Sequence, residues 1–351
     1  MIVKNEAAVL ARCLDCVKDI VDEIIIVDTG SSDTTTSIAR TYTNKVFNFA
    51  WINDFSAARN FSFQQATKDY ILWLDADDVI TPKNQRRLNA LKAELDSKTD
   101  FVMMKYHTAF DENGNVSLSF YRERLIKNNR KFLWQDPVHE VITPKGKIVY
   151  SDIAVEHHKI CGSENPKRNL NIYRGMINDK KEFSPRQWFY YARELMYNGY
   201  LQESVDAFLK FLDARAGWKE NHIEACKNLS EIFRRQNQFD KSYAALFRSF
   251  QYDLPRAEIC CDIGLNFLDE GKYYEAAFWY KLALTIKPNA ENGAFCLPDC
   301  YNYIPNIQLC FIYDKLNDKK SAKTYNESAA AFKPKSQSVL YNRRYFEHNG
   351  I

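Results

Sequence analysis

The sequence has no long apolar run and no N-terminal segment of the kind that directs secretion. No stretch of about 18 apolar residues occurs, which argues against a membrane-spanning helix. The N-terminus also lacks a basic segment followed by an apolar one, so a secretory signal is not indicated. We therefore expect a cytoplasmic protein without a membrane span.

The chain has little net charge. It contains 48 Lys and Arg against 45 Asp and Glu, for a formal charge of +3. This balance gives no electrostatic basis for nucleic acid as the main partner, because binding a polyanion requires a basic surface. Hydrophobic residues make up 46% and charged residues 26%, which is ordinary for a globular protein. A length of 351 residues exceeds the size at which single cores stop growing, so we expect two domains.

The nine cysteines do not complete a metal-binding pattern. Cys13 and Cys16 form one CxxC pair, but no second CxxC or Cys/His pair accompanies it as a zinc site would require. We interpret the cysteines as reduced thiols buried in packing, as is usual in the cytosol. A GxGxxG segment after the first predicted strand is also missing, which argues against a dinucleotide-binding enzyme.

Short β-rich runs alternate with helical patterns at the start of the chain. These runs are continuously apolar, which indicates a parallel sheet covered by helices on both faces. We predict an α/β, doubly wound domain over residues 1–165, extended by an antiparallel hairpin with its turn at Asn113–Gly114. Ligands of such a sheet bind beyond the carboxyl ends of its strands. The predicted strands are MIVK (1–4), EIIIVD (23–28), KVFNF (45–49) and DYILWLD (69–75).

Residues 166–351 have a helical pattern in which one element recurs four times. Ser242 and Ala276 are 34 residues apart, the period of the tetratricopeptide helix pair, whereas the intervals from Ser204 and to Ser321 are 38 and 45. We predict an all-α domain of stacked hairpins similar to tetratricopeptide repeats; an irregular bundle is the alternative. Such a domain suits extended peptides or partner proteins, and a homodimer would be expected to form through it. The copies are GYLQESVDAF (199–208), QFDKSYAALF (238–247), KYYEAAFWYKLAL (272–284) and NDKKSAKTYNESA (317–329).

Three carboxylates follow the last predicted strand within four residues, in the motif Asp75-Ala76-Asp77-Asp78. Like charges at this spacing repel one another, so a cation is expected beside them. Carboxylate oxygens at the ligand edge of a sheet suit Mg²⁺ or Mn²⁺, which in turn binds phosphate. A loop or capping role is the alternative for an Asp-x-Asp motif on its own.

Four segments occur in order over the first 78 residues: MIVKNE, IIIVDTGSSDTT, DFSAARN and WLDADD. In this order they resemble the nucleotide-sugar half of family 2 glycosyltransferases, which have the GT-A fold. The resemblance implies an inverting transferase that uses Mn²⁺ or Mg²⁺ as cofactor and takes a hexose or N-acetylhexosamine from a UDP-sugar donor. A repeat scaffold whose α/β half has lost activity is the alternative. The intact charged residues argue against it, because they are costly without their ion.

The resemblance also implies where the nucleotide binds. Val3, Lys4 and Asn5, at the end of the first strand, would line the base and ribose. Asp28, at the end of the second strand, would hydrogen-bond the uracil, and the turn after it would let the base approach. A helix N-cap turn is the alternative role for Asp28.

Arg59 would face the nucleotide, since a guanidinium offers fixed donors for carbonyl or phosphate oxygens. A solvated surface position is the alternative. Asp75 and Ala76 would contact the sugar and the nucleotide, and Asp77 would bind the divalent ion. Asp78 would orient these residues or cap the next helix.

The segment WQDPVHE (134–140) resembles an acceptor-side segment of some family members. An inverting transferase needs a carboxylate opposite the leaving nucleotide to take the acceptor's proton. Glu140 is the predicted base, Asp136 is the competing candidate, and His139 would orient one of them or the acceptor. A structural role for the His-Glu pair is the alternative, since many relatives carry Glu-Asp here.

His157 ends the β-rich run IAVEHH (153–158) and would be the third metal ligand. It is preferred over His158 because related peptide transferases have a similar Val-x-His segment. A structural histidine is the alternative.

The combination of a GT-A half with tetratricopeptide-like helices looks like the bacterial peptide S- and O-glycosyltransferases, among them one that modifies a bacteriocin on sulfur. It implies that the acceptor is a Ser, Thr or Cys side chain of a peptide or protein. A saccharide or lipid-linked acceptor is the alternative, because lipopolysaccharide-core transferases share the His-Glu-like segment.

Overall fold

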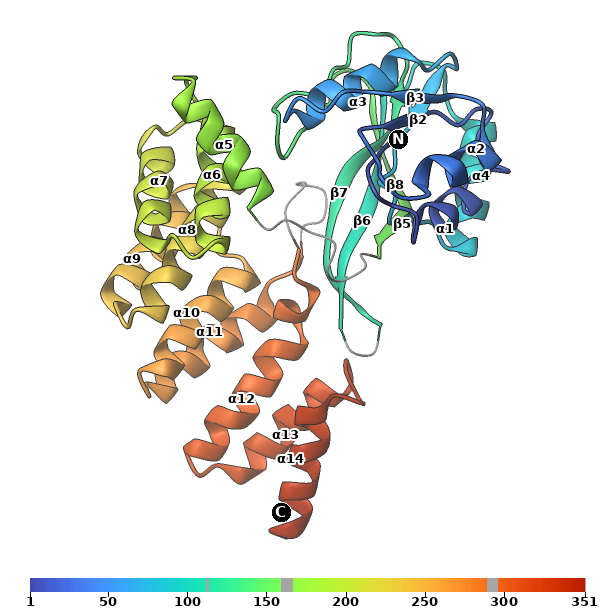
Figure 1. Ribbon diagram of the computed structural model, residues 1–351. Coiled ribbons are helices and arrows are strands. Elements are labelled where there is room, and N and C mark those ends of the chain that lie inside the picture. The colour runs from blue at the N-terminus through green and yellow to red at the C-terminus, as the bar shows by residue number, and fades with distance from the viewer. Residues whose placement is uncertain (112–113, 159–166, 289–295, 351) are drawn as a thin grey trace. The chain divides into compact units, whose positions relative to one another are not determined.

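The structure is a computed structural model that describes residues 1–111, 114–158, 167–288 and 296–350. It divides into two compact units, which are seen in Figure 1. Met1–Ala109 and Ser119–Lys181 form the α/β unit, whereas Phe110–Leu118 and Glu182–Ile351 form the helical unit. The predicted order of an α/β region followed by a helical region is therefore confirmed.

Three short parallel strands form the first sheet of the α/β unit, in the order β1-β2-β3. β2 (Ile26–Asp28) lies between β1 (Ile2–Val3) and β3 (Val46–Asn48), in a register that sets Val3 opposite Asp28. The carboxyl ends of the strands therefore meet at one edge, where ligands of doubly wound sheets bind. Helices α1 (Leu10–Asp15) and α2 (Thr35–Tyr42) connect these strands.

Five strands form the second sheet, in the order β4-β7-β6-β8-β5. β4 pairs antiparallel with β7, and β5 pairs antiparallel with β8, whereas β6 and β8 are parallel. Glu112 and Asn113, in the predicted hairpin turn between β6 and β7, lie outside the described residues. The strands are β4 (Tyr70–Leu72), β5 (Asp78–Val79), β6 (Phe101–Phe110), β7 (Val116–Lys127) and β8 (Ile148–His157).

The run 69–75 is not the fourth strand of the parallel sheet that the sequence predicts. Its central part forms β4, which pairs with β7 at the edge of the second sheet. The run 23–28 is also shorter than predicted, because β2 begins only at Ile26. A strand is defined by hydrogen bonds to an adjacent strand. Because β1 begins at Ile2 and pairs only with Val27 and Asp28, no described strand lies beside Ile24 and Ile25.

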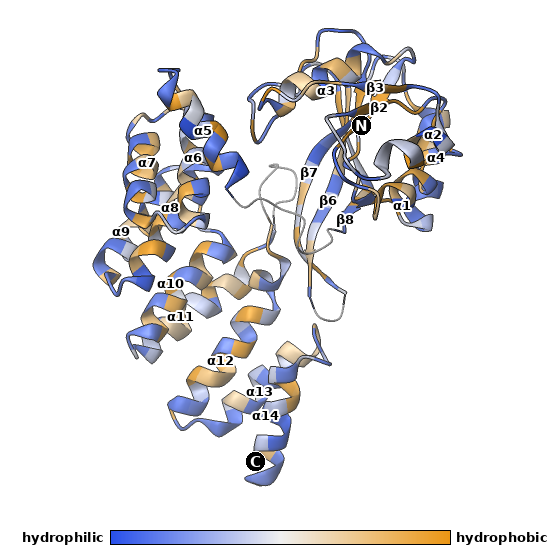
Figure 2. Cartoon of the chain, in the orientation of Figure 1, coloured by the Kyte–Doolittle hydropathy of each residue, from blue (hydrophilic) through white to orange (hydrophobic). Residues whose placement is uncertain are grey.

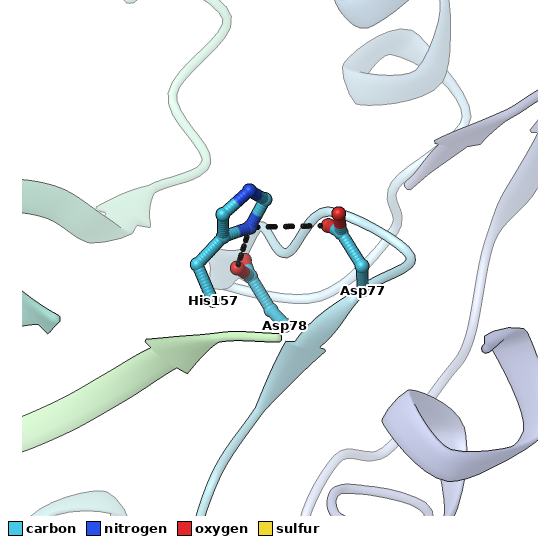
Figure 3. A group of neighbouring side chains, drawn as sticks. All are labelled: Asp77, Asp78 and His157. Carbon is cyan, nitrogen blue, oxygen red and sulfur yellow. Dashed lines mark ion pairs between the residues drawn. The ribbon is translucent and has the colours of Figure 1, made fainter. Parts of the chain in front are cut away.

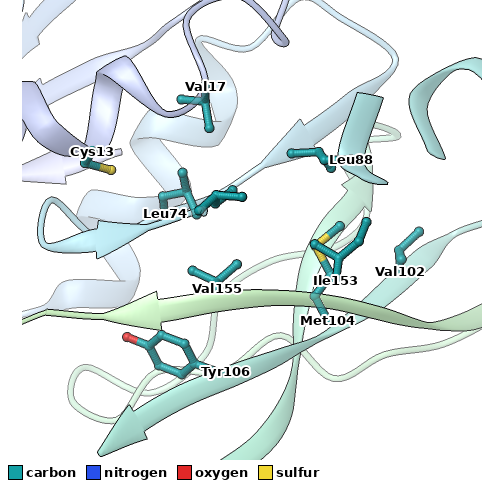
Figure 4. Packing of buried hydrophobic residues seen from close by; sticks show 10 residues of the cluster. Cys13, Val17, Leu74, Leu88, Val102, Met104, Tyr106, Ile153 and Val155 are labelled. Atoms are coloured by element: carbon teal, nitrogen blue, oxygen red, sulfur yellow. The ribbon is translucent and has the colours of Figure 1, made fainter. Parts of the chain in front are cut away.

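Helices α3 (Phe55–Gln64) and α4 (Pro82–Glu94) begin at residues that favour a helix start. The Asp54 side chain caps α3 by accepting from the N–H of Ala57, and Pro82 occupies the first turn of α4. α5 (Arg168–Asn178) also belongs to this unit. Figure 4 shows the core cluster that fixes α1 and α4 against the second sheet: Cys13, Val17, Leu74, Ile80, Leu88, Val102, Met104, Tyr106, Ile153 and Val155.

Consecutive helical hairpins make up the helical unit, and the predicted repeats are thereby confirmed. Each of the four self-similar sequence elements forms the second helix of a pair, and Figure 2 shows polar and apolar residues alternating along these helices. Such amphipathic helices bury one face against their neighbours. The pairs are α6 (Pro185–Tyr197) with α7 (Leu201–Asp213), α8 (Lys219–Arg235) with α9 (Phe239–Arg248), α10 (Ala257–Asp269) with α11 (Tyr273–Thr285), and α12 (Tyr303–Lys315) with α13 (Lys319–Ala330), followed by α14 (Gln337–His348).

A small, fully buried residue occupies the fourth position of the second helix in every pair. In the first pair, the hydroxyl of Ser204 donates to the carbonyl of Ala192, twelve residues earlier, at 2.8 Å. In the second pair, Ser242 donates to the carbonyl of Ser230, again twelve residues earlier, at 3.0 Å. The equivalent residues in the third and fourth pairs are Ala276 and Ala322.

The fourth repeat is therefore one residue out of the register that the sequence suggests. Ala322, not Ser321, is the buried equivalent of Ala276, so the last interval is 46 residues rather than 45. The sequence pattern suggests Ser321 because the first two repeats have serine, Ser204 and Ser242, at the equivalent position. Burial in the pair decides the equivalence.

The turn inside each hairpin contains a residue in the left-handed region. A helix commonly ends on such a residue because it redirects the chain while satisfying the last carbonyls. Glycine adopts this region at no steric cost, and asparagine tolerates it. The four residues are Gly199 (φ 82°), Asn237 (φ 57°), Gly271 (φ 72°) and Asn317 (φ 62°).

All eight described cysteines are free, and six of them are buried. This agrees with the interpretation of the cysteines as packed thiols, and Cys161 lies outside the described residues. Among the described helices, none has the length and apolar character needed to cross a membrane.

Candidate metal and nucleotide site

Asp77, Asp78 and His157 come together where β5 pairs with β8 (Figure 3). The ladder sets Asp78 directly opposite His157. Nδ1 of His157 lies 3.3 Å from Oδ1 of Asp77 and 3.6 Å from Oδ1 of Asp78. One potential ligand atom from each residue lies within 4.8 Å of the others. The structure thus brings the predicted ligands Asp77 and His157 together and adds Asp78 to them.

The imidazole of His157 lies beside two carboxylates. Its Nδ1 is buried and makes no hydrogen bond. Burial disfavours the charged ring, but Asp77 and Asp78 outweigh this effect and raise the pKa of His157 to about 10. The cluster thus favours a positive charge at its centre, and a neutral imidazole with two carboxylates is a donor set that suits Mn²⁺ or Mg²⁺. The residues present therefore fit a divalent ion.

Asp78 is held by buried partners. Nη1 of Arg124 donates to Oδ2 of Asp78 at 2.8 Å, and both side chains are 0% exposed. The hydroxyl of Tyr106 donates to Oδ1 of Asp78 at 3.0 Å, and the N–H of Asp75 donates to Oδ2 at 2.9 Å. Because Arg124 balances its charge, Asp78 acts chiefly to fix the turn of the acidic motif.

The guanidinium of Arg124 lies between two aromatic rings. Its central carbon is 4.0 Å from the ring centre of Trp73 and 4.1 Å from that of Tyr106. Nε and Nη2 of Arg124 have no hydrogen-bond acceptor, so the faces of the two rings supply the remaining stabilisation of its charge.

Arg59, on α3, joins two of the predicted carboxylates. Its Nη2 donates to Oδ1 of Asp75, and its Nε donates to Oε1 of Glu140, both at 2.6 Å. Arg59 is only 8% exposed, and its guanidinium lies over the rings of Trp73 and Trp134. It is therefore a buried bridging residue rather than a solvated surface arginine.

The ion pair with Arg59 keeps Asp75 ionised. Burial alone would raise the pKa of Asp75, but the charge of Arg59 outweighs it and holds the pKa well below its usual range. Asp75 is linked in turn to the candidate metal ligands, because its N–H donates to the side chain of Asp78 and its carbonyl accepts from the N–H of Asp78 at 3.1 Å. The Arg59 bridge and the group formed by Asp77, Asp78 and His157 are thus parts of one continuous network.

The loop that carries Glu140 is narrow. The backbone groups of Gln135 and Val141 exchange hydrogen bonds of 2.9 and 3.1 Å across it. Asp136 (φ 69°) and His139 (φ 53°) adopt the left-handed region, which is uncommon for residues other than glycine. The loop conformation is therefore imposed by its surroundings, as is frequent at functional sites.

The three predicted catalytic residues differ in their surroundings. The side chain of Glu140 is 13% exposed and is bound to Arg59. The ring of His139 stacks on Tyr173 of α5, at 6.5 Å between centres and 18° between planes. His139 thus packs against a helix, whereas Asp136 lies at the other end of the loop from Glu140.

The carboxylate of Asp28 is used by the turn that follows it. Its Oδ2 accepts from the N–H of Gly30 at 3.1 Å and from that of Ser31 at 3.0 Å. These bonds correspond to the turn role that the sequence leaves as the alternative for Asp28. Among the described residues, no hydrogen bond or ion pair joins Asp28 to Asp75 or Asp77.

The other predicted nucleotide residues lie at the end of β1 beside this turn. Asn5 has a left-handed backbone (φ 56°), and its Oδ1 accepts from the N–H of Ser32 at 2.8 Å. Val3 is buried, its carbonyl accepts from Thr29, and Lys4 is exposed. The ends of β1 and β2 thus form one polar rim. Ala76 is buried in the hydrophobic cluster beneath them.

Glu6 is a further carboxylate whose charge interacts with this site. Burial, together with the charges of Asp77 and Asp75, raises the pKa of Glu6 to about 7. The shift follows from placing another acid beside a cluster that already carries negative charge.

Comparisons with known proteins identify the α/β unit. Residues 1–151 match the family model described as glycosyl transferase family 2. The chain therefore carries a family 2 glycosyltransferase domain, and the expectation drawn from its four N-terminal segments is confirmed.

Several curated proteins match parts of the chain. A TPR repeat-containing protein of Synechococcus elongatus is 40% identical over 144 residues, which cover 40% of this chain and 34% of that protein. The SPbeta prophage-derived glycosyltransferase SunS of Bacillus subtilis is 28% identical over 260 residues, which cover 68% of this chain and 59% of SunS. An uncharacterized glycosyltransferase of Rickettsia felis is 37% identical over 93 residues, covering 26% of this chain and 32% of that protein. The chain thus spans from 32% to 59% of the length of these relatives.

Proposed function

We propose that this protein is a metal-dependent inverting glycosyltransferase that moves a hexose or N-acetylhexosamine from a UDP-sugar to a Ser, Thr or Cys side chain of a peptide or protein. The observation that carries the proposal is the continuous network in the family 2 domain. In it, Asp77, Asp78 and His157 lie close enough together to hold a cation, and Arg59 links the adjoining Asp75 to Glu140.

The donor end of the site follows from this network. Asp77 and His157, with Asp78 beside them, would hold the Mn²⁺ or Mg²⁺ ion. When bound, this ion supplies positive charge that stabilises the diphosphate leaving group. The uridine would lie along the rim formed by Val3, Lys4, Asn5 and Asp28, and Asp75 would contact the ribose or sugar.

The acceptor end is centred on Glu140. This carboxylate, whose Oε1 accepts a hydrogen bond from Arg59, would take the proton from the acceptor hydroxyl or thiol as the acceptor oxygen or sulfur attacks the anomeric carbon. The bond from that carbon to the diphosphate oxygen breaks in the same displacement, so the configuration inverts and no covalent enzyme intermediate is needed. Asp136 is the second candidate for the base.

A polypeptide acceptor is supported by the helical unit. Stacked helical hairpins offer extended surfaces that suit peptides. The match to SunS covers 68% of the chain, whereas residues 1–181 make up only about half of it, so the similarity extends into the helical unit. The similarity to SunS is therefore not confined to the α/β unit.

Mass spectrometry of a peptide library after incubation with mixed UDP-sugars and Mn²⁺ would test the proposal. We expect a mass increase of one hexose or N-acetylhexosamine on peptides that contain Ser, Thr or Cys, and its loss in EDTA. A modified saccharide with unmodified peptides would replace the peptide acceptor by a sugar. Absence of transfer and hydrolysis for every donor, together with no thermal shift by UDP and Mn²⁺, would contradict a transferase altogether.

A further inference from the structure

A cavity of about 270 Å³ lies between α8 and α10, the first helices of the second and third pairs (Figure 1). A water molecule takes up about 30 Å³ of the liquid, so the cavity has room for a long side chain with water beside it. From α10 it is lined by Asp262, Leu265 and Asn266. These three share one face of the helix because they are three and four residues apart.

Ser230 and Asn266 form the floor of this cavity. Both are buried, whereas the other residues that line it are half-buried. Nδ2 of Asn266 donates to the hydroxyl oxygen of Ser242 at 2.7 Å. Because the single hydroxyl proton of Ser242 is donated to the carbonyl of Ser230 at 3.0 Å, the Ser242 oxygen accepts from Asn266. This arrangement fixes the orientation of the Asn266 amide.

The oxygen of the same amide is unused. Oδ1 of Asn266 is buried and has no hydrogen-bond partner among the described residues. It lies on the side of the amide away from Ser242, and Asn266 itself lines the cavity. A buried acceptor without a donor costs free energy, so a ligand that brings a donor to this oxygen would recover that cost.

Asp262 is a second acceptor without a partner. No described residue forms an ion pair or a hydrogen bond with its carboxylate. Lys227, which also lines the cavity, is instead ion-paired with Glu224 at 3.3 Å. Asp262 and Asn266 are one helical turn apart, so α10 presents two unused acceptors on the same side.

The remaining charged groups that line the cavity are paired. Arg234 forms an ion pair with Asp269 at 2.7 Å, and Glu231 forms one with Arg235. The carboxylate of Asp262 is therefore left as the unbalanced charge of the cavity. Because its charge is negative, the cavity attracts a cation and repels an anion.

A basic side chain fits this cavity better than a metal ion. Among the described residues, Asp262 belongs to no group of three His, Cys, Asp or Glu whose ligand atoms lie within 4.8 Å of one another. Divalent ions need more oxygen ligands than Asp262 and Asn266 supply. The charged head of lysine or arginine brings several N–H donors, and its methylene stem can pack on Leu265.

An exposed tyrosine near the cavity indicates that the ligand is larger than one side chain. The charge of Glu224, in the cavity wall, acts on Arg193 of α6. Nη2 of Arg193 donates to the hydroxyl of Tyr197 at 2.7 Å, and Tyr197 is 62% exposed. Tyrosine is typical of surfaces that bind proteins and peptides. A polypeptide with a basic residue therefore suits this part of the helical unit.

We propose that this cavity binds a lysine or arginine side chain of an extended polypeptide, whose cationic head donates to the carboxylate of Asp262 and to Oδ1 of Asn266. The proposal rests on the proposed function in taking this polypeptide to be the acceptor, and it adds that the acceptor carries a basic residue. Lysine and arginine share the chemistry that the cavity recognises, a cation with several N–H donors.

Affinity selection from a pool of random twelve-residue peptides with blocked ends would test this inference. The immobilised full chain is incubated with the pool without UDP-sugar or metal, and the bound peptides are sequenced by mass spectrometry. We expect peptides that contain lysine or arginine to be enriched at least tenfold over the input, and the enriched residue type shows which of the two is preferred. The formal charge of +3 gives the chain no general attraction for basic peptides.

Asp262→Asn is the test variant, because it keeps the size of the side chain but removes the charge. Enrichment should fall to the input level in this variant, since a hydrogen bond to a charged group is lost. Asp240→Asn, at an exposed position on α9, is the control and should retain the enrichment. Enrichment of acidic peptides, no enrichment of basic ones, or equal enrichment by the Asp262 variant would overturn the inference.

Transfer assays separate this inference from the proposed function. With Mn²⁺ and UDP-sugars, Asp262→Asn should raise the KM for a basic peptide at least tenfold and leave kcat unchanged. Binding of basic peptides without any transfer would contradict the transferase and leave the binding site in place. Transfer to peptides without any preference for basic residues would contradict the binding site and leave the transferase in place.

Discussion

Asp75 and Glu140 are 65 residues apart in the sequence, yet both accept a hydrogen bond of 2.6 Å from the guanidinium of Arg59. One of these carboxylates belongs to the acidic motif and the other to the loop that follows Trp134. The guanidinium of Arg59, which both carboxylates share, therefore sets the spacing between the donor side and the acceptor side of the proposed site. Arg59 can do this because it is buried and its donors form a rigid fork.

Glu140→Gln should separate binding from transfer. Glutamine keeps an oxygen that can accept from Nε of Arg59 but cannot take a proton. UDP-sugar binding should therefore remain nearly unchanged in calorimetry, while the transfer rate falls about 10²-fold or more. Asp136→Asn is the matched variant. Full transfer activity of Glu140→Gln with a loss in Asp136→Asn would move the role of base to Asp136.

Asp77→Asn should abolish the metal dependence of nucleotide binding. The substitution preserves side-chain size but removes one of the charges that would hold the divalent ion. Titration of UDP in the presence and absence of Mn²⁺ should show stimulation for the unmodified protein and none for the variant. Asp19→Asn, at an exposed position on the same unit, is the control. Stimulation of the Asp77 variant by Mn²⁺ to the normal extent would contradict its role as a ligand.

Asp262→Asn should stabilise the helical unit in a pH-dependent way. Burial, against the opposing charge of Lys227, raises the pKa of Asp262 to about 6. Between this value and the usual pKa of about 3.9, the folded state holds a proton that the unfolded state releases, so stability falls as the pH rises. Asparagine has no proton to release in this range, so the variant should not lose stability in this way as the pH rises.

Thermal unfolding of the Asp262 variant at two pH values would check the sign. The Tm should exceed that of the unmodified protein at pH values above 7, and the difference should disappear near pH 4. Asp269→Asn, at an exposed position on the same helix, should show no comparable trend. A gain for the Asp262 variant that is equal at both pH values would rule out the titration as its cause.

Gly264→Ala should destabilise the third helical pair. A Cβ atom at Gly264 would lie 3.0 Å from Cε2 of Tyr280, whose side chain is almost fully buried. Overpacking of this kind costs about 1–3 kcal/mol. Gly175→Ala is the control, since nothing lies within 4 Å of its added atom and alanine favours α5 by about 0.5–1 kcal/mol. In urea, the free energy of unfolding should fall for the Gly264 variant and rise for the Gly175 variant. An undiminished free energy of unfolding for Gly264→Ala would mean that Tyr280 can move to make room for the added atom.

Much of the fold could be predicted from local patterns. Asp54 and Pro82 mark the starts of α3 and α4, and each recurring element became the second helix of a pair. The strands at 23–28 and 69–75 were predicted too long because strand length depends on a neighbouring strand. Sequence pattern reports the apolar character of a run but not whether a partner is present beside it.

The part of the site made of side chains that can bind a metal ion could be predicted from residue type alone. Asp77 and His157 were selected as donors, and the structure brings them together. Arg124 was missed because an arginine in a strand normally suggests an exposed position. The signal for it was the spacing of Arg122 and Arg124, two residues apart in β7, which places both side chains on one face of the strand. The pairing of Arg124 with Asp78 depends on long-range packing that no local pattern contains.

The separation of twelve residues within the first two helical pairs contrasts with intervals of 38, 34 and 46 residues between successive pairs. The longest of these intervals contains the long connection between α11 and α12, residues 286–302, whereas the extra length of the first interval lies in its helices, since α8 has 17 residues and α10 has 13. Such connections can lengthen without disturbing the helix crossing on either side of them. Diversity among related chains should accordingly be found in those connecting loops, which makes them the natural place to graft new recognition segments.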